Sequence, residues 1–113
     1  MIKFQRITTK DATLYNYMEQ LMTASFPSEE YRPLEELRNY TDTKTHFYCN
    51  IILHHDTPVG FITYWDFGHF YYVEHFAIDP SLRNGGHGKN VLNHLCQQLN
   101  KPIILEVEMP EEE

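Results

Sequence analysis

YVEHFAIDPSLRNGGHGKNVLNHLCQQL, from Tyr72 to Leu99, is the stretch that decides the fold of this 113-residue chain. It begins as an apolar extended run, turns at Asp79-Pro80, and passes through a glycine-rich segment into residues with helical apolar spacing. Glycines let successive backbone N–H groups point into one concavity, and the start of a helix adds partial positive charge there. The stretch therefore predicts a binding site for a phosphate or pyrophosphate.

The segments around this stretch predict three helices and a sheet. Oxygens of Thr8, Thr9 and Asp11 are expected to cap a first helix, which Phe26-Pro27 ends. A short turn follows, a second helix starts with Pro33 in its first turn, and residues 41–45 read as a loop. A third helix follows Gly88. Strands are expected at residues 2–7, 46–53, 59–67, 69–78 and 103–107, with a five-residue turn at 54–58 and the last strand parallel to the one that ends at Ile78.

Composition limits the class of protein. The length suits one domain, and 42% hydrophobic residues predict a packed globule. A formal net charge of −7 argues against nucleic acid or an anionic membrane as partner. No run reaches the roughly 18 apolar residues that span a bilayer, and no signal peptide begins the chain, so a cytoplasmic location is expected. Cys49 and Cys96 are expected to be buried, because their spacing suits neither a disulfide framework nor a zinc ribbon.

Two common phosphate motifs fail in the glycine segment. A P-loop needs glycine where Arg83 stands, and serine or threonine where Asn90 stands. A dinucleotide fingerprint needs a small residue where Val91 stands. Neither a nucleotide hydrolase nor a dehydrogenase is favoured.

The segment does match Arg-x-x-Gly-x-Gly, as Arg83-Asn84-Gly85-Gly86-His87-Gly88, after a strand that ends in Phe76-Ala77-Ile78-Asp79-Pro80. This resembles the acetyl-CoA-binding segment of the GNAT superfamily of N-acetyltransferases. The order of elements is similar along essentially the whole chain, as is Val59-Gly60-Phe61 in the preceding strand. The resemblance implies an α/β fold with a mixed, mostly antiparallel sheet flanked by helices, formed by residues 1–113 as a single domain.

The resemblance also implies the donor and its site. Backbone amides of the glycine segment would hold the pyrophosphate of coenzyme A, and the pantetheine arm would lie beside the strand end. Main-chain donors there would polarise the thioester carbonyl. The implied cofactor-binding residues are Phe76, Ala77, Ile78, Arg83, Asn84, Gly85, Gly86, His87, Gly88 and Lys89.

Transfer to an amine needs the nitrogen unprotonated, so a general base is required. Glu74 is the first choice, two residues from the expected thioester position and, by strand alternation, on one face with Tyr72, Phe76 and Ile78. The alternative is that Glu74 only binds the substrate ammonium or forms a structural ion pair. His75 is expected on the opposite face, packed beneath a helix.

The leading hypothesis is an N-acetyltransferase that moves an acetyl group from acetyl-CoA to a primary amine of a small molecule or peptide. Its rivals are a non-catalytic acyl-CoA-binding module and a plain interaction domain. The histidines show no repeated ligand spacing, so no metal is expected.

The end of the chain departs from the family, which continues with a further helix and a hairpin. An artificial truncation or clipped product is favoured over a naturally short form or a dimer that completes the sheet. Residues 103–107 would form an exposed apolar edge, through which a homodimer could pair.

Overall fold

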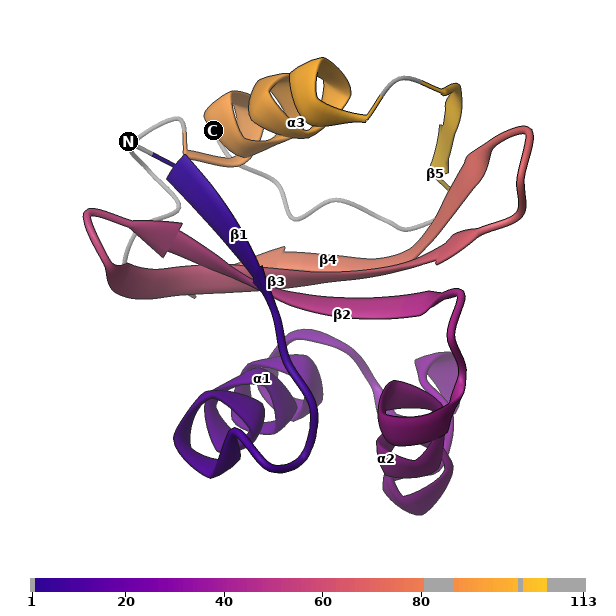
Figure 1. Ribbon diagram of the computed structural model, residues 1–113. Helices are drawn as coiled ribbons and strands as arrows, with labels where there is room; N and C mark the ends of the chain where they lie inside the picture. The colour runs from indigo at the N-terminus through magenta and orange to yellow at the C-terminus, as the bar shows by residue number, and fades with distance from the viewer. Residues whose placement is uncertain (1, 81–86, 100, 106–113) are drawn as a thin grey trace.

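The computed structural model of the chain describes residues 2–80, 87–99 and 101–105 (Figure 1). The strands are β1 (Ile2–Arg6), β2 (Phe47–His54), β3 (Thr57–Asp66), β4 (Tyr71–Ile78) and β5 (Ile103–Leu105). The helices are α1 (Ala12–Ser25), the 3-10 turn η1 (Ser28–Glu30), α2 (Leu34–Thr43) and α3 (His87–Gln98). Residues 106 and 107 of the fifth expected strand lie outside the described residues.

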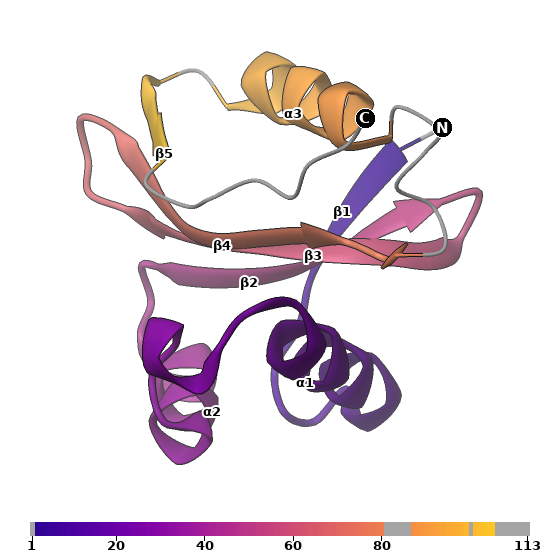
Figure 2. The same cartoon turned by 180° about the vertical axis from the view of Figure 1, so that it is seen from behind.

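The five strands form one sheet in the order β1-β2-β3-β4-β5. The first four are antiparallel to their neighbours, and β5 pairs in parallel with β4 at Tyr71–Val73. The expected mixed, mostly antiparallel sheet and the parallel last strand are therefore confirmed. Figures 1 and 2 show α1 and α2 against one face of the sheet and α3 against the other.

Each face of the sheet has its own apolar core. The α1/α2 face includes Met18, Met22 and Leu37, all nearly inaccessible to solvent. The α3 face includes Val91 and Leu95. Helical spacing of the apolar residues explains both arrangements, because residues three and four apart share one side of a helix.

The cap of α1 differs from the expectation. Asp11 is the N-cap residue, but its side chain makes no capping hydrogen bond to the helix. Asp11 Oδ2 instead accepts a bond of 2.9 Å from the Thr8 backbone N–H, within the preceding turn. Thr9 donates to the carboxylate of Asp42, which ties this turn to α2. The capping oxygens are thus used to brace the loop before the helix.

The prediction of a loop at residues 41–45 was wrong for its first half, because α2 continues to Thr43. Thr41 is buried, and its hydroxyl donates a hydrogen bond of 2.8 Å to the backbone carbonyl of Leu37. The hydroxyl of Thr43 likewise donates a hydrogen bond of 2.7 Å to the backbone carbonyl of Asn39. A threonine that bonds back to the carbonyl four residues earlier is satisfied within a helix. Polar composition alone did not indicate this.

The β2–β3 turn is also shorter than the five residues expected. Both strands run to the turn, which consists of His55 and Asp56 with φ of 51° and 67°. Positive φ at both central residues is the geometry of a type I′ hairpin turn, and aspartate tolerates it. Thr57 and Pro58 therefore belong to β3.

Cys49 is buried as expected, but Cys96 is exposed on the solvent side of α3, so its predicted burial was wrong. Burial raises the pKa of the Cys49 thiol to about 12. None of the helices in the described ranges is long and apolar enough to cross a bilayer.

Candidate functional site

A bulge in β4 organises the candidate site. Thr63 of β3 faces His75 and the next residue, Tyr64, faces Val73, so Glu74 is the extra residue of β4. A bulge of this kind interrupts the alternation of side chains along a strand.

The prediction that Glu74 shares a face with Phe76 and Ile78 was therefore wrong, although Glu74 does line one pocket with Tyr72. Phe76 and Ile78 belong to the core on the α3 face, whereas Ala77 belongs to the core on the α1/α2 face. Glu74 and His75 both contact residues that lead into α2, so the bulge places two consecutive polar side chains on that face.

Glu74 is held by two donors. Its Oε2 accepts a hydrogen bond from Arg32 Nη2, as part of an ion pair, and another from Trp65 Nε1 at 3.0 Å. The side chains of Glu74 and Arg32 are 15% and 24% exposed, so the pair is largely shielded from water. This arrangement is the structural ion pair that the sequence left as an alternative to a catalytic base.

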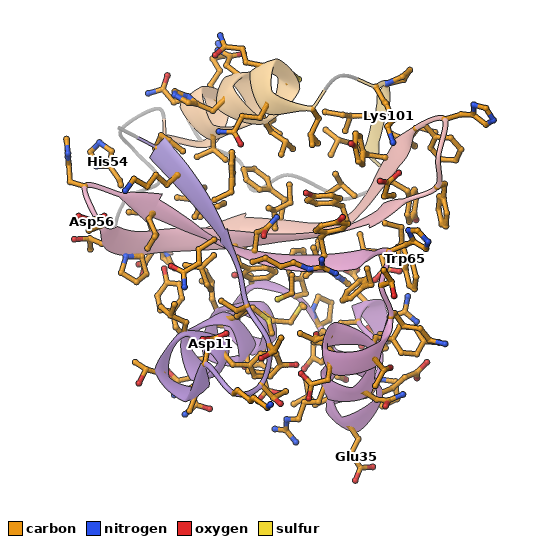
Figure 3. All side chains as sticks on the ribbon, viewed as in Figure 1. Asp11, Glu35, His54, Asp56, Trp65 and Lys101 are labelled. Atoms are coloured by element: carbon orange, nitrogen blue, oxygen red, sulfur yellow. The ribbon has the colours of Figure 1, made fainter. Side chains whose placement is uncertain are left out.

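Arg32 joins η1 and α2 to the sheet. Its guanidinium lies 4.6 Å from the centre of the Tyr40 ring and 6.0 Å from that of Trp65, and Glu36 approaches within 3.6 Å. A cation over an aromatic face adds attraction to the ion pair. Figure 3 shows Trp65 near the end of the central strand β3, on the side of the sheet where α2 lies. No local pattern in the sequence could indicate this contact, because Arg32 and Glu74 are 42 residues apart.

His75 is 8% exposed and anchored at one ring nitrogen. Its Nε2 lies 2.8 Å from the backbone carbonyl oxygen of Glu30, and its ring meets that of Phe26 edge-on, with centroids 5.0 Å apart. It therefore packs against η1 and the end of α1, on the same side of the sheet as Glu74. The prediction that His75 lies on the opposite face from Glu74 was wrong, because the bulge places both side chains on one face.

A pocket of about 380 Å³ opens between η1 and β4. Three carboxylates and one guanidinium line it, together with aromatic rings and an imidazole. Its walls are formed by Glu29, Glu30, Tyr31, Arg32, Tyr72, Glu74 and His75. The excess of carboxylates suits a cationic guest.

The C-terminal end of β4, beyond the residues that line this pocket, is closely packed against β3. Gly60 faces Ile78, and a Cβ at Gly60 would lie 2.3 Å from the Ala77 carbonyl oxygen. Only glycine permits this approach of the two backbones. Asp79, just beyond the strand, accepts a hydrogen bond of 3.2 Å from the Tyr17 hydroxyl. Burial and the neighbouring Asp79 raise the Tyr17 pKa.

The expected cofactor residues are only partly described. Phe76, Ala77 and Ile78 are buried at the end of β4. His87, Gly88 and Lys89 form the start of α3, where Lys89 is exposed. Arg83, Asn84, Gly85 and Gly86 lie outside the described residues.

A second pocket of about 410 Å³ lies at the far end of the β3–β4 hairpin, beside β5. Asp66 accepts hydrogen bonds of 3.0 Å there from the Gly68 backbone N–H and from Lys101 Nζ, and these two bonds hold the pKa of Asp66 below its ordinary value. Figure 3 shows Lys101 beside β5, away from Trp65 and α2. Among the described residues, no group of three or more metal-ligating side chains is assembled.

Comparison with known proteins identifies the family. A profile described as "Acetyltransferase (GNAT) family" matches residues 12–113. The chain belongs to the GNAT acetyltransferase family. The GNAT resemblance seen in the glycine segment is therefore confirmed.

A solved structure of a GNAT-family protein supports the same assignment. A GNAT-family protein from Bacteroides thetaiotaomicron is 61% identical, with a TM-score of 0.91 over 98% of this chain and 63% of that one. This GNAT chain thus spans less than two thirds of the length of that relative. No curated protein matches it in a sequence search.

More distant structures share the fold. An aminoglycoside acetyltransferase from an uncultured soil metagenomic sample, in complex with sisomicin, is 18% identical, with a TM-score of 0.67 over 95% of this chain and 78% of that one. A ribosomal-protein-alanine N-acetyltransferase from Brucella melitensis biovar Abortus 2308 is 13% identical, with a TM-score of 0.68 over 96% and 81%. At these identities the likeness shows the GNAT fold alone.

Proposed function

We propose that this chain belongs to an enzyme that transfers an acetyl group from acetyl-CoA to a primary amine of a small molecule or peptide. The observation that carries the proposal is the pocket between η1 and β4, which gathers carboxylates and an imidazole along the first half of β4 in a GNAT fold. Amines are protonated near neutral pH, and carboxylates attract the ammonium form to the pocket.

The proposed donor site is the one implied by the family. The backbone of Phe76, Ala77 and Ile78 would bind the pantetheine arm, and residues 83–89 would bind the pyrophosphate. The start of α3 fits this role, because its first turn carries Lys89 and no acidic residue. An anion there would meet the positive end of the helix dipole without repulsion from a carboxylate. When bound, acetyl-CoA supplies an activated acyl group.

The acceptor class rests on charge. The chain carries a formal charge of −7, and the pocket has more carboxylates than cations. Two distant relatives, an aminoglycoside acetyltransferase and a ribosomal-protein-alanine N-acetyltransferase, are named for amine acceptors. For this chain we propose an amine of either class.

Several further expectations belong to the same proposal. Residues 1–113 are taken as one acetyl-CoA-binding unit that works in the cytoplasm, without nucleic acid or membrane as partner. Ile104 and Leu105 of β5 are each 40% exposed. An exposed apolar edge favours pairing with another strand, so a homodimer through β5 is included.

One observation favours the second candidate, a non-catalytic acyl-CoA-binding module. Arg32 and Trp65 already bind Glu74, the residue that the sequence proposed as base. An engaged carboxylate can shape the pocket wall without taking part in proton transfer.

The experiment is a calorimetric titration of the full chain with coenzyme A, followed by an assay of thiol release from acetyl-CoA with a panel of primary amines. Amine-dependent thiol release supports the transferase. Binding of coenzyme A without release supports the binding module. Absence of binding in the micromolar range removes both candidates.

A further inference from the structure

We infer that His75 takes the proton of the acceptor ammonium, through Nδ1 of its imidazole ring. This inference rests on the proposed function and assigns the step that the sequence gave to Glu74. It is carried by three observations: the bulge in β4, the bond between His75 and Glu30, and the partners of Glu74.

The bulge brings His75 to the pocket. Regular alternation after Val73 would place Glu74 and His75 on opposite faces of the sheet. Because Glu74 is the extra residue of the bulge, both side chains line the same pocket. Ala77, on the same face, is two residues further along the strand, in the segment proposed to bind the thioester arm.

The hydrogen bond to Glu30 determines which ring nitrogen can act as a base. A backbone carbonyl oxygen only accepts hydrogen bonds, so His75 Nε2, 2.8 Å away, must carry a proton and donate it. In the neutral ring the lone pair then lies on Nδ1. Among the described residues, the one hydrogen bond found for this ring uses Nε2.

The same reasoning makes Glu74 a positioning residue. Its Oε2 accepts hydrogen bonds from both Arg32 and Trp65, and Arg32 is also its ion-pair partner. A carboxylate oxygen offers about two lone pairs, so these two donors already occupy Oε2. Glu74 instead fixes the wall of the pocket and adds negative charge next to the imidazole.

The charged and titratable groups around the ring come from η1, the segment before α2, and β4. Histidine is the side-chain type that exchanges its proton near neutral pH. Three of the surrounding groups are carboxylates, and the one guanidinium that lines the pocket, that of Arg32, is paired with Glu74. The groups that line the pocket with His75 are Glu29 and Glu30 from η1, Tyr31 and Arg32 before α2, and Tyr72 and Glu74 from β4.

The ammonium R–NH₃⁺ gives one proton to His75 Nδ1, and the freed lone pair forms the C–N bond at the thioester carbonyl carbon. The C–S bond breaks and its electron pair stays on sulfur. The nitrogen loses its second proton to the thiolate, which leaves as coenzyme A thiol, and His75 returns the first proton to solvent. The amide, the thiol and one proton are the products.

Two substitutions separate proton transfer from support of the fold. In His75→Gln, the side-chain amide reaches the position of Nε2 and can still donate to the Glu30 carbonyl, but no base remains. His75→Asn places an amide at the position of Nδ1 and loses that bond. His69→Gln, in the exposed β3–β4 turn, is the matched control. Thermal unfolding and coenzyme A calorimetry establish that each variant folds and binds the donor.

With the full chain and the best amine of the panel, we expect His75→Gln to lower kcat by about 100-fold or more at neutral pH, with a much smaller change in KM for the amine. The deficit should shrink as the pH approaches the pKa of the amine itself, because the acceptor then loses its proton unaided. A His75→Gln kcat within a factor of about three of wild type at every pH overturns the role of His75.

Nitrogen NMR of the imidazoles in the wild-type chain is the second measurement, and it does not depend on how the variants fold. We expect the neutral His75 ring to carry its proton on Nε2; a proton on Nδ1 overturns the inference. A wild-type chain that acetylates no amine overturns the proposed function and this role together. An active wild type with an equally active His75→Gln overturns the role of His75 alone.

Discussion

Replacing Arg32 by methionine removes the guanidinium that joins the segment before α2 to the bulge in β4. Methionine keeps a long apolar stem, so the change acts mainly on the ion pair and on the contact with Tyr40. Glu74, 15% exposed, would keep Trp65 as a donor but lose its cation. Removing one partner of a largely shielded charged pair leaves the other charge poorly compensated.

The expected cost follows from the geometry. A charged group that loses a hydrogen-bonded partner in a partly buried site costs about 2 kcal/mol, and the lost cation–π contact with Tyr40 adds about 0.5–1 kcal/mol. The free energy of unfolding should therefore fall by about 2–3 kcal/mol. For a domain of this size, the midpoint of thermal unfolding should fall by roughly 8–15 °C.

The assay is urea unfolding of wild type, Arg32→Met, Glu74→Gln and the double variant. Glu74→Gln removes the charge that Arg32 compensates, so the double variant should lose less stability than the sum of the two single changes, by about 1–2 kcal/mol. Lys3→Met is the control, because Lys3 pairs with Asp56 at 3.6 Å on an exposed edge and should cost under about 0.5 kcal/mol. Additive losses for Arg32 and Glu74 would refute the ion pair as the link between η1–α2 and the sheet.

Three further outcomes are expected. Gly60→Ala should destabilise the chain by at least about 2 kcal/mol in urea unfolding, because its Cβ would meet the Ala77 carbonyl oxygen. Asp42→Asn should be less stable than wild type at neutral pH, because hydrogen bonds hold the pKa of Asp42 below its ordinary value. Around these two pKa values, the unfolded wild-type chain binds more protons than the folded one. The stability difference between wild type and Asp42→Asn should therefore vanish as the pH falls through the lowered pKa of Asp42. A thiol reagent should label Cys96 in the folded chain and Cys49 only after unfolding.

Each of these outcomes has a control or a contrary result. Gly68→Ala should cost only about 1 kcal/mol, because Gly68 has a positive φ of 93° but no atom within 4 Å of its Cβ position. Equal losses for the two glycine variants would contradict the close approach of β3 and β4. A stability difference for Asp42→Asn that persists in strong acid would show that the effect is not electrostatic. Equal labelling rates for the two cysteines would contradict the burial of Cys49.

The elements that the sequence predicted are those with a strong local period. The alternation of β1 and the helical spacing of Leu14, Met18 and Leu21 reflect burial of one face, which constrains each residue type in turn. Element ends were less predictable. Thr41 lies in a polar stretch that is typical of a loop. Only the structure shows that α2 continues through it and that its hydroxyl donates a hydrogen bond to the Leu37 carbonyl.

The sequence predicted only part of the candidate site. Glu74 and His75 were placed at the right point in the chain, but a bulge adds one residue without any change in composition. In β4 both faces are largely buried, so the apolar pattern carried no signal of the register shift. Arg32 could not be found at all, because its role depends on a partner in a distant strand.

NMR chemical-shift mapping shows whether the acceptor amine binds in the pocket between η1 and β4. The best amine of the panel is titrated into the full chain saturated with coenzyme A. We expect shifts at Tyr72, Glu74 and His75, and none at Lys101 in the second pocket. Shifts confined to the second pocket would contradict this expectation.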